Sequence, residues 1–204
     1  VPNLAIRAGN AVALTEANNI TTGALAAQVT TGGQGFTFAD VNDLTIGTVD
    51  GLAGVVTSDA AITLSAGNAG SPGNLTINND LTAKLGPITP PAAGANARIT
   101  NNATISNLGG HPVLLTADRM ALGVGAITTT GGSRVTIRSF TPGRQIDLGS
   151  NVDTTPNALE LSSNELFSIT TSGVLQIGDA STGAVTISAP ISVVANTLTI
   201  INSG

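Results

Sequence analysis

Histidine and serine are the residue types that would carry nucleophilic catalysis, and the chain contains a single histidine. His111 lies in Gly109-Gly110-His111-Pro112, with Asp118 nearby in the sequence. A Ser-His-Asp triad needs an imidazole that is buried and oriented by a carboxylate. A Gly-Gly-His-Pro segment is instead typical of a solvated turn. The sequence therefore predicts no catalytic residue.

The twelve acidic residues are scattered, and the closest groupings are Asp40/Asp43 and Glu160/Glu165. Enzymes that cleave sugars use paired carboxylates. The segment Asp40-Val41-Asn42-Asp43 could offer Ca²⁺ several oxygen ligands, but no full ligand set follows it. We therefore expect these side chains to cap turns, with Asp40 and Asp43 as the candidate metal ligands and no cofactor.

Three of the seven basic residues, Arg134, Arg138 and Arg144, form the one local basic cluster. Residues 134 and 138 fall on the same face if the segment is a strand. The three arginines are therefore candidate contacts to an acidic polymer. The net charge of −5 argues against nucleic acid as a partner.

The composition excludes several classes of protein. Hydrophobic residues make up 41% of the 204 residues and charged residues 9%, which does not fit a disordered chain. Cysteine is absent, so disulfides and thiolate metal sites are excluded. No apolar run is long enough to cross a bilayer, so we expect no membrane insertion. Because the chain opens at Val1 without a leader, we expect a processed product or a segment of a longer polypeptide.

Short segments of alternating apolar and polar residues recur along the chain. Between residues 133 and 192, each segment places two aliphatic residues two positions apart: SRVTIRS, GRQIDLGS, NALELSS, GVLQIGD and GAVTISA. Strict alternation is the period of a strand with one buried face. The best helix candidate, Ser162–Leu166, is one turn at most. The sequence therefore predicts an all-β chain.

Repeats of short strands with a period of roughly 20–25 residues indicate a solenoid. Tandem immunoglobulin-like sandwiches are the rival fold, but they usually contain a buried Trp and a corner Tyr, and this chain has neither. We predict a right-handed parallel β-helix, one β-solenoid domain over residues 1–204, with roughly nine coils. Its inward rows should include Ile137, Leu148, Leu161, Ile177, Ile187 and Ile200.

The alternation lapses at about residues 86–96, where GPITPPAAGAN contains Pro87, Pro90 and Pro91. Proline cannot donate a hydrogen bond to a β-ladder. Because the repeat resumes at Ala97–Thr100, we predict a Pro-rich loop that leaves the solenoid rather than a domain boundary.

Residues 133–192 resemble the repeats of the filamentous haemagglutinin-type exoproteins, adhesins exported by two-partner secretion. The resemblance rests on SRVTIRSFTPGRQIDLGS and ALELSSNELFSITTSGVLQIGDASTGAVTISAPI, with a looser version in AITLSAGNAGSPGNLTINNDLTA. It implies a right-handed β-helix at the bacterial cell surface or outside the cell, acting in adhesion, aggregation or biofilm matrix. The Asn-Pro-Asn-Gly signal of the family's secretion domain is absent, so the segment is expected to be shaft.

The leading functional hypothesis is a non-enzymatic structural β-solenoid of the adhesin type, with a host or matrix glycan as a partner. A second hypothesis is a ligand- or ice-binding solenoid, because Thr128-Thr129-Thr130 and Thr170-Thr171 could order water on a flat face. A third is a polysaccharide-active enzyme, which would need a cleft with two carboxylates within about 10 Å.

The ends of the repeat pattern carry a further expectation. Strand-like alternation runs from Leu4 to Ile201, and neither end shows an amphipathic helix or charged run that could cap a solenoid. Uncapped strand edges tend to pair with other strands. We therefore expect flanking solenoid coils or a head-to-tail homo-oligomer, which would grow into a filament.

Overall fold

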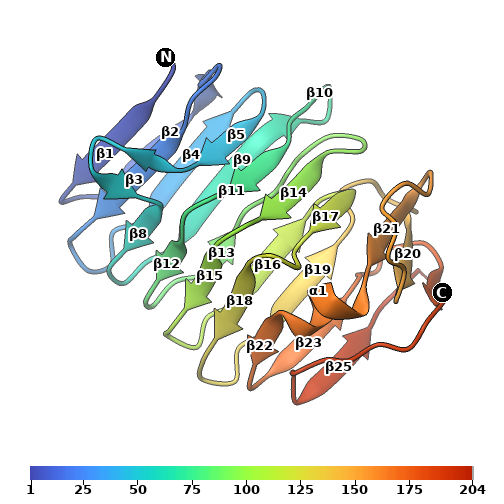
Figure 1. Ribbon diagram of the computed structural model, residues 1–204. Coiled ribbons are helices and arrows are strands. Elements are labelled where there is room, and N and C mark those ends of the chain that lie inside the picture. Colours follow the sequence, from blue (N-terminus) through green and yellow to red (C-terminus); the bar gives the residue numbers. More distant parts are fainter. Residues whose placement is uncertain (204) are drawn as a thin grey trace.

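The computed structural model describes residues 1–203, apart from the side chain of Ala17. The chain is 47% strand and 2% helix, and its parallel sheets stack as a β-solenoid of about eight turns. The two chain ends lie at opposite ends of the solenoid (Figure 1). The prediction of an all-β parallel β-helix is confirmed.

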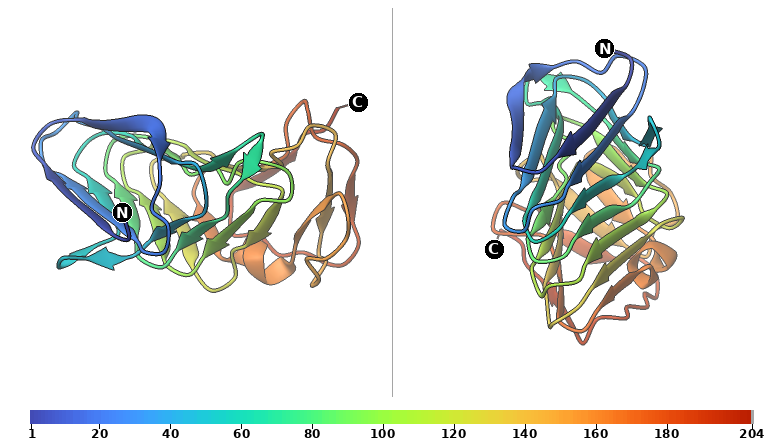
Figure 2. Two further views of the ribbon diagram at one scale, coloured as in Figure 1. Left: turned by 90° about the horizontal axis from the view of Figure 1, so that it is seen from above. Right: turned by 90° about the vertical axis from the view of Figure 1, so that its left-hand side faces the viewer.

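Each turn of the solenoid crosses three faces (Figure 2). Face 1 contains β5 (Leu44–Ile46), β11 (Leu75–Ile77), β14 (Arg98–Asn101) and β17 (Arg119–Ala121). Face 2 contains β8 (Val55–Thr57), β12 (Leu81–Ala83), β15 (Thr104–Asn107), β18 (Ala126–Thr129) and β22 (Ile169–Thr171). Face 3 contains β2 (Val12–Asn18), β4 (Phe36–Asp40), β9 (Ile62–Asn68), β13 (Ile88–Thr89), β16 (Val113–Thr116), β19 (Val135–Arg138), β23 (Val174–Ile177) and β25 (Thr197–Ile200).

The remaining strands join or decorate these faces. β1 (Leu4–Ala8) pairs with β3 (Leu25–Val29), and β3 pairs with both β5 and β8, so faces 1 and 2 share one sheet. Two antiparallel additions are the hairpin of β6 (Thr48–Val49) with β7 (Leu52–Ala53), and β10 (Ser71–Pro72) against β9. A separate sheet near the C-terminal end contains β20 (Gln145–Leu148), β21 (Ala158–Leu161) and β24 (Val185–Ile187).

The core consists of apolar rows, because parallel strands in register place each inward residue on its equivalent in the next coil. On face 3 one such row is Phe36, Ile62, Ile88, Val113, Val135, Leu175 and Leu198. All but the last are fully buried, and each such side chain contributes about 1.5–3 kcal/mol of transfer free energy.

The Pro-rich segment is part of this core, so the prediction of a loop at residues 86–96 is wrong. β13 pairs in parallel with β9 and β16, and Ile88 is fully buried. The prolines supply carbonyl groups: those of Pro87 and Pro91 accept from the amides of Ile62 and Ala66. The donors come from the residues that follow, Ile88 and Ala92. The ladder survives because proline removes only its own N–H.

The one helix among the described residues, α1 (Ser163–Phe167), follows β21 directly. Ser162 and Glu165 form a reciprocal capping box at its first turn, which confirms the expected single turn. The structure contains no helix of the length and apolarity needed to cross a membrane within residues 1–203.

The strands of face 1 depart from sequence order near the C-terminal end. The length of the coils shows this on the neighbouring face 2. There Ile105 pairs with Ile127, 22 residues later, but Ile127 pairs with Ile169, 42 residues later, so the second coil is longer. The additional residues contain β20, a loop and β21, and β21 lies between β17 and β20. The chain therefore passes over one strand position with β20 and returns to fill it with β21.

We call the boundary between β17 and β21 the seam, and residues 149–157 the seam loop. No backbone hydrogen bond joins β17 to β21 among residues 1–203. The ladders of face 2, from β18 to β22, and of face 3, from β19 to β23, continue past the same position. The sheet is thus interrupted on one face only.

The inward residues of the terminal coils are in register but lack a covering coil. Ile137, Leu148, Leu161 and Ile177 are fully buried, as predicted. Ile187 and Ile200 pair with Leu148 and Ile177 respectively, yet they are 56% and 40% exposed. Both residues therefore hold the inward positions that were predicted for them, but a residue in a terminal coil is covered on one side alone.

Candidate functional site

Two of the three predicted arginines lie on face 3, at the two ends of β19. Arg138 donates from Nη1 to Asp179 Oδ2 at 2.9 Å and from Nε to Thr116 Oγ1 at 3.0 Å. Arg134 donates from Nη1 to Gln176 Oε1 at 2.6 Å. Both guanidinium groups are held by neighbouring strands and remain partly exposed.

A shallow groove of about 340 Å³ runs along face 3 beside Arg138. Its lining combines hydroxyl, apolar and charged side chains, including Thr63, Thr89, Leu114, Arg138, Phe140 and Asp179. Burial alone would raise the pKa of Asp179, but hydrogen bonds from Ser181 and from Arg138 hold this pKa below its ordinary value. The groove therefore presents a fixed ion pair beside an apolar floor.

Arg144 is buried, so the prediction that it contacts a polymer is wrong. Its guanidinium lies 3.5 Å from Asp118 Oδ2 and donates to the carbonyl oxygen of Ala158 at 3.1 Å. The Asp118 side chain is fully buried and also accepts from the amides of Asn96 and Thr141. Burial lowers the pKa of the Arg144 guanidinium, and Asp118 offsets part of this effect. The pair joins the corners of successive coils.

Asp40 and Asp43 lie at a turn, and their carboxylates accept backbone amide protons. Asp40 accepts from the amides of Ile20 at 2.8 Å and Asn42 at 3.0 Å, whereas Asp43 accepts from the amide of Asn74 at 2.8 Å. Both therefore cap turns of different coils. Residues 1–203 contain no cluster of three or more potential metal ligands.

His111 is placed at the corner between faces 2 and 3. Its backbone N–H donates to Asn107 Oδ1 at 3.2 Å. The carboxylate of Asp118, the acid nearest to it in sequence, is engaged by Arg144 and Thr141. His111 and Asp118 therefore have different hydrogen-bond partners, and the structure does not pair them as a triad would require.

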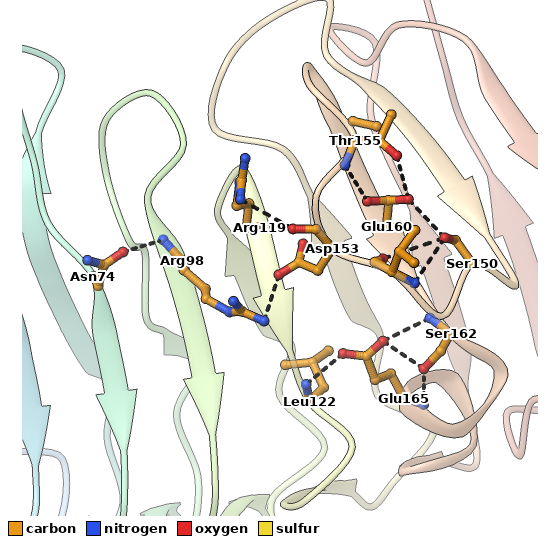
Figure 3. A network of polar contacts seen from close by, with 12 residues as sticks. Asn74, Arg98, Arg119, Leu122, Ser150, Asp153, Thr155, Glu160, Ser162 and Glu165 are labelled. Atoms are coloured by element: carbon orange, nitrogen blue, oxygen red, sulfur yellow. Dashed lines mark hydrogen bonds and ion pairs between the residues drawn. The ribbon is translucent and has the colours of Figure 1, made fainter.

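Sequence reasoning did not find the polar network that lies at the seam (Figure 3). The carboxylate of Asp153, from the seam loop, lies 2.6 Å from Arg98 Nη2. The backbone carbonyl oxygen of Asp153 accepts a hydrogen bond from Arg119 Nη1 at 3.2 Å. Arg98 and Arg119 are register partners on β14 and β17. The spacing of Arg98 and Arg119 by one coil was a signal in the sequence that these two arginines are neighbours. Nothing in the sequence around Asp153 indicates that it meets them.

Two glutamates complete this network by organising its loop and helix. Glu160 accepts from the hydroxyls of Ser150 and Thr155, both at 2.8 Å. Glu165 accepts from the amide of Leu122 at 3.0 Å and from Ser162. All four carboxylate oxygens are thus occupied by the chain itself. The two acids have structural roles.

Asp153 differs from these glutamates. Both of its oxygens are buried, and neither makes a well-directed hydrogen bond, although Oδ2 pairs with Arg98. Burial raises the pKa of Asp153, and the positive charges of Arg98 and Arg119 offset part of this effect. A cavity of about 330 Å³ lies beside it, lined by Arg98, Met120, Asn151, Asp153, Asn164 and Glu165 among others. The seam is therefore polar and incompletely packed.

Threonines form single outward rows on the faces. Thr45, Thr76 and Thr100 are register partners on face 1, and Thr37, Thr63 and Thr89 form a row on face 3. In the stretches that suggested water ordering, Thr128 and Thr170 point outward whereas Thr129 and Thr171 are buried. The adjacent outward positions hold other residue types, so within residues 1–203 no face carries two parallel rows of threonine.

Comparison with protein-family models, with curated proteins and with solved structures gives no match for this chain.

Proposed function

We propose that this chain is a non-enzymatic structural protein, a length of shaft in a β-solenoid of the adhesin type, located at the bacterial cell surface or secreted. The continuous core supports this proposal, because its aliphatic rows stay in register up to the terminal coils. The polar side chains of the seam and corners are engaged in holding coils together. The adhesin type and the location rest on the resemblance of residues 133–192.

The proposal includes continuation of the solenoid beyond its terminal coils. Ile187 and Ile200 expose apolar surface on the side where a further coil would stack. At the other end Leu4, Ile6, Val12 and Leu14 are half-buried in the same way. The partners are flanking coils of a longer polypeptide or the opposite end of a second copy, and a second copy would generate a filament.

Light scattering and electron microscopy on the 204-residue chain test the second of these partners. We expect concentration-dependent head-to-tail filaments. The double variant Ile187→Lys, Ile200→Lys should remain monomeric with an unchanged melting temperature, because both positions are exposed in the isolated chain. A wild-type chain that stays monomeric at high concentration, with ordered terminal coils, would contradict filament formation.

We further propose that face 3 contacts a host or matrix glycan through Arg138, which lines the groove, and through Arg134 at the other end of β19. The partly exposed guanidinium groups and the neighbouring hydroxyl rows support this role. Binding of an acidic polysaccharide should weaken in Arg138→Gln and not in Arg7→Gln, which changes an exposed arginine at the other end of the solenoid. Equal weakening in both variants would indicate non-specific charge attraction.

Ordering of water or ice is the alternative function, and the single rows of outward threonines favour it. Ice binding would require broader, regular rows than those present on the three faces. Thermal hysteresis of the purified protein separates the two functions, and the structural proposal predicts none.

A further inference from the structure

Two hollows lie end to end on face 3. The groove beside Arg138 reaches back to Thr63 on β9. A second hollow of about 340 Å³ lies over β2, β4 and β9 and includes Ser65, two residues after Thr63 on the same strand. Because residues two apart on a strand point to the same side of a sheet, the two hollows meet on β9. We call the continuous surface that they form the face 3 track.

The face 3 track follows the axis of the solenoid and crosses the strands. Its lining includes register partners from successive coils: Thr63 pairs with Thr89, and Pro91 pairs with Thr116, which pairs with Arg138. The track extends over seven neighbouring strands of face 3, from β2 to the end of β23. The six intervals between these strands, of about 4.8 Å each, give a length of about 29 Å.

Side-chain hydrogen bonds align the polar groups of the track from coil to coil. Thr89 Oγ1 donates to Thr63 Oγ1 at 3.3 Å, and Arg138 Nε donates to Thr116 Oγ1 at 3.0 Å. A hydroxyl has two lone pairs as well as its proton, so these groups can still bond to a ligand. Because their positions are already fixed, a ligand that binds here has less side-chain freedom to remove.

Apolar side chains lie among these polar groups. Pro91, Leu114 and Phe140 line the part of the track near β19. A sugar ring presents hydroxyl groups at its edge and C–H groups on its faces, so it matches a surface that combines apolar contacts with a few placed polar groups. A pyranose unit in an extended chain is also similar in length to the spacing of about 4.8 Å between coils.

We propose that the face 3 track binds one extended, linear glycan chain parallel to the solenoid axis, with about one sugar unit over each coil. This inference rests on the proposed glycan contact of face 3, and adds the direction, conformation and minimum length of the glycan.

The two ends of the track differ in charge. At the β19 end Arg138 pairs with Asp179 at 2.9 Å, and its side chain remains 39% exposed. At the β2 end Glu16 is exposed, whereas the Asp40 carboxylate is buried and accepts from backbone amides. Five intervals, about 24 Å in all, separate β2 from β19. An acidic chain held at Arg138 therefore reaches Glu16 only if it has about six sugar units or more.

Hyaluronan oligosaccharides of defined length test this arrangement, because they are linear and carry a carboxylate on every second sugar. Titration calorimetry at low ionic strength compares a tetrasaccharide with a decasaccharide on the 204-residue chain. We expect the decasaccharide to bind several-fold more tightly, since it covers both hollows. Arg138→Gln should weaken the binding of both oligosaccharides.

Glu16→Gln reports the direction of the bound chain. It should tighten the binding of the decasaccharide by about two- to fivefold, the effect of one exposed charge pair, and leave the tetrasaccharide unchanged. The gain should disappear at high salt. Asp50→Asn is the matched control, because it removes one exposed negative charge from the tip of the β6–β7 hairpin, outside the lining of the track. It should change the binding of neither oligosaccharide.

The results separate failure of the glycan contact from failure of the axial chain. If neither oligosaccharide binds, or Arg138→Gln binds both as the wild type does, the glycan contact of face 3 is wrong and the axial chain with it. If Arg138→Gln weakens binding but Glu16→Gln has no effect, or tightens both lengths equally, the contact stands and the axial chain is wrong. An equal gain in Asp50→Asn would also overturn the axial chain, because the gain would then come from the net charge of the protein.

Discussion

At the residue scale, the contribution of an inward side chain to stability depends on whether a coil covers it on both sides. Ile177 and Ile187 are the same residue type in the same kind of inward row. Ile177 lies between β19 and β25 and is fully buried, whereas Ile187 on β24 has a neighbour on one side and is 56% exposed. Sequence alternation identifies the row, but not the number of neighbours.

This difference provides a matched pair of substitutions. Ile177→Asp should lower the free energy of unfolding by several kcal/mol, because a buried carboxylate would have no partner. Ile187→Asp should cost about 1 kcal/mol or less, since that position is open to water. Denaturant unfolding of both variants measures the difference. Equal losses would mean that the two positions have the same environment.

Glu160 gives a prediction about the pH dependence of stability. Burial would raise the pKa of Glu160, but hydrogen bonds from Thr155 and Ser150 outweigh it and hold this pKa below its ordinary value. A depressed pKa contributes stability that is present above the ordinary value and lost as the pH falls through the folded value. Glu160→Gln should therefore cost about 1–3 kcal/mol at neutral pH and progressively less in acid. Thermal unfolding between neutral and acidic pH measures this, and a pH-independent loss would contradict it.

At the element scale, a short strand can be essential although its sequence does not resemble a strand. β13 has two residues between prolines, yet Ile88 continues the buried row between Ile62 and Val113. The hairpin of β6 and β7 has clearer turn chemistry, with Asp50 and Gly51 at positive φ, but it adds no rung to the three faces. Membership of the ladder, rather than strand propensity, decides the contribution of each element.

Two deletions should separate these elements. Removal of Pro87–Ala95 should abolish cooperative folding or lower the melting temperature sharply, because it removes one rung of face 3 and a corner. Replacement of Thr48–Ala53 by a two-glycine turn should cost little, since the hairpin contacts the solenoid mainly through Arg7 and β3. Circular dichroism and calorimetry compare the two. Tolerance of the first deletion would show that the neighbouring coils can close over the gap.

The solenoid could be predicted from the sequence because alternation of period two and the coil period are local signals. The alternation at Val135/Ile137 and Leu175/Ile177 is directly visible in the sequence. The ladder through Ile88 could not be seen, because the missing donors of Pro87 and Pro91 conceal the fact that their carbonyls still accept. Asp153 and Arg98 are 55 residues apart in the sequence and meet only through the return of β21. The burial of Arg144 likewise depends on Asp118 from another coil.

At the scale of the whole molecule, stability is distributed along one dimension, because each coil contacts mainly the coils before and after it. The terminal coils have one neighbour and the central coils have two. Local unfolding of the terminal coils therefore costs less free energy than local unfolding of the central coils.

Hydrogen exchange should show this gradient in an isolated monomeric chain. Amides of β15 and β16 should be the slowest to exchange, and those of β1 and β25 the fastest among the strands. In a filament the terminal strands should become as protected as the central ones. Uniform protection in the monomer would contradict a nearest-neighbour description of stability.

The return of the chain at β21 also constrains the order in which the molecule can fold. In a simple solenoid each new coil finds a completed edge as a template, so folding can follow the chain from one end. β20 has no such template, because the place next to β17 is reserved for a strand that comes later in the sequence. Until residues 158–161 are available, β20 must wait unpaired or occupy the place of β21 by mistake. In a chain that emerges from a narrow channel, folding would therefore be expected to pause after β20 and before β21. The rate-limiting step would be the placement of β21 between β17 and β20, rather than the closure of a long loop.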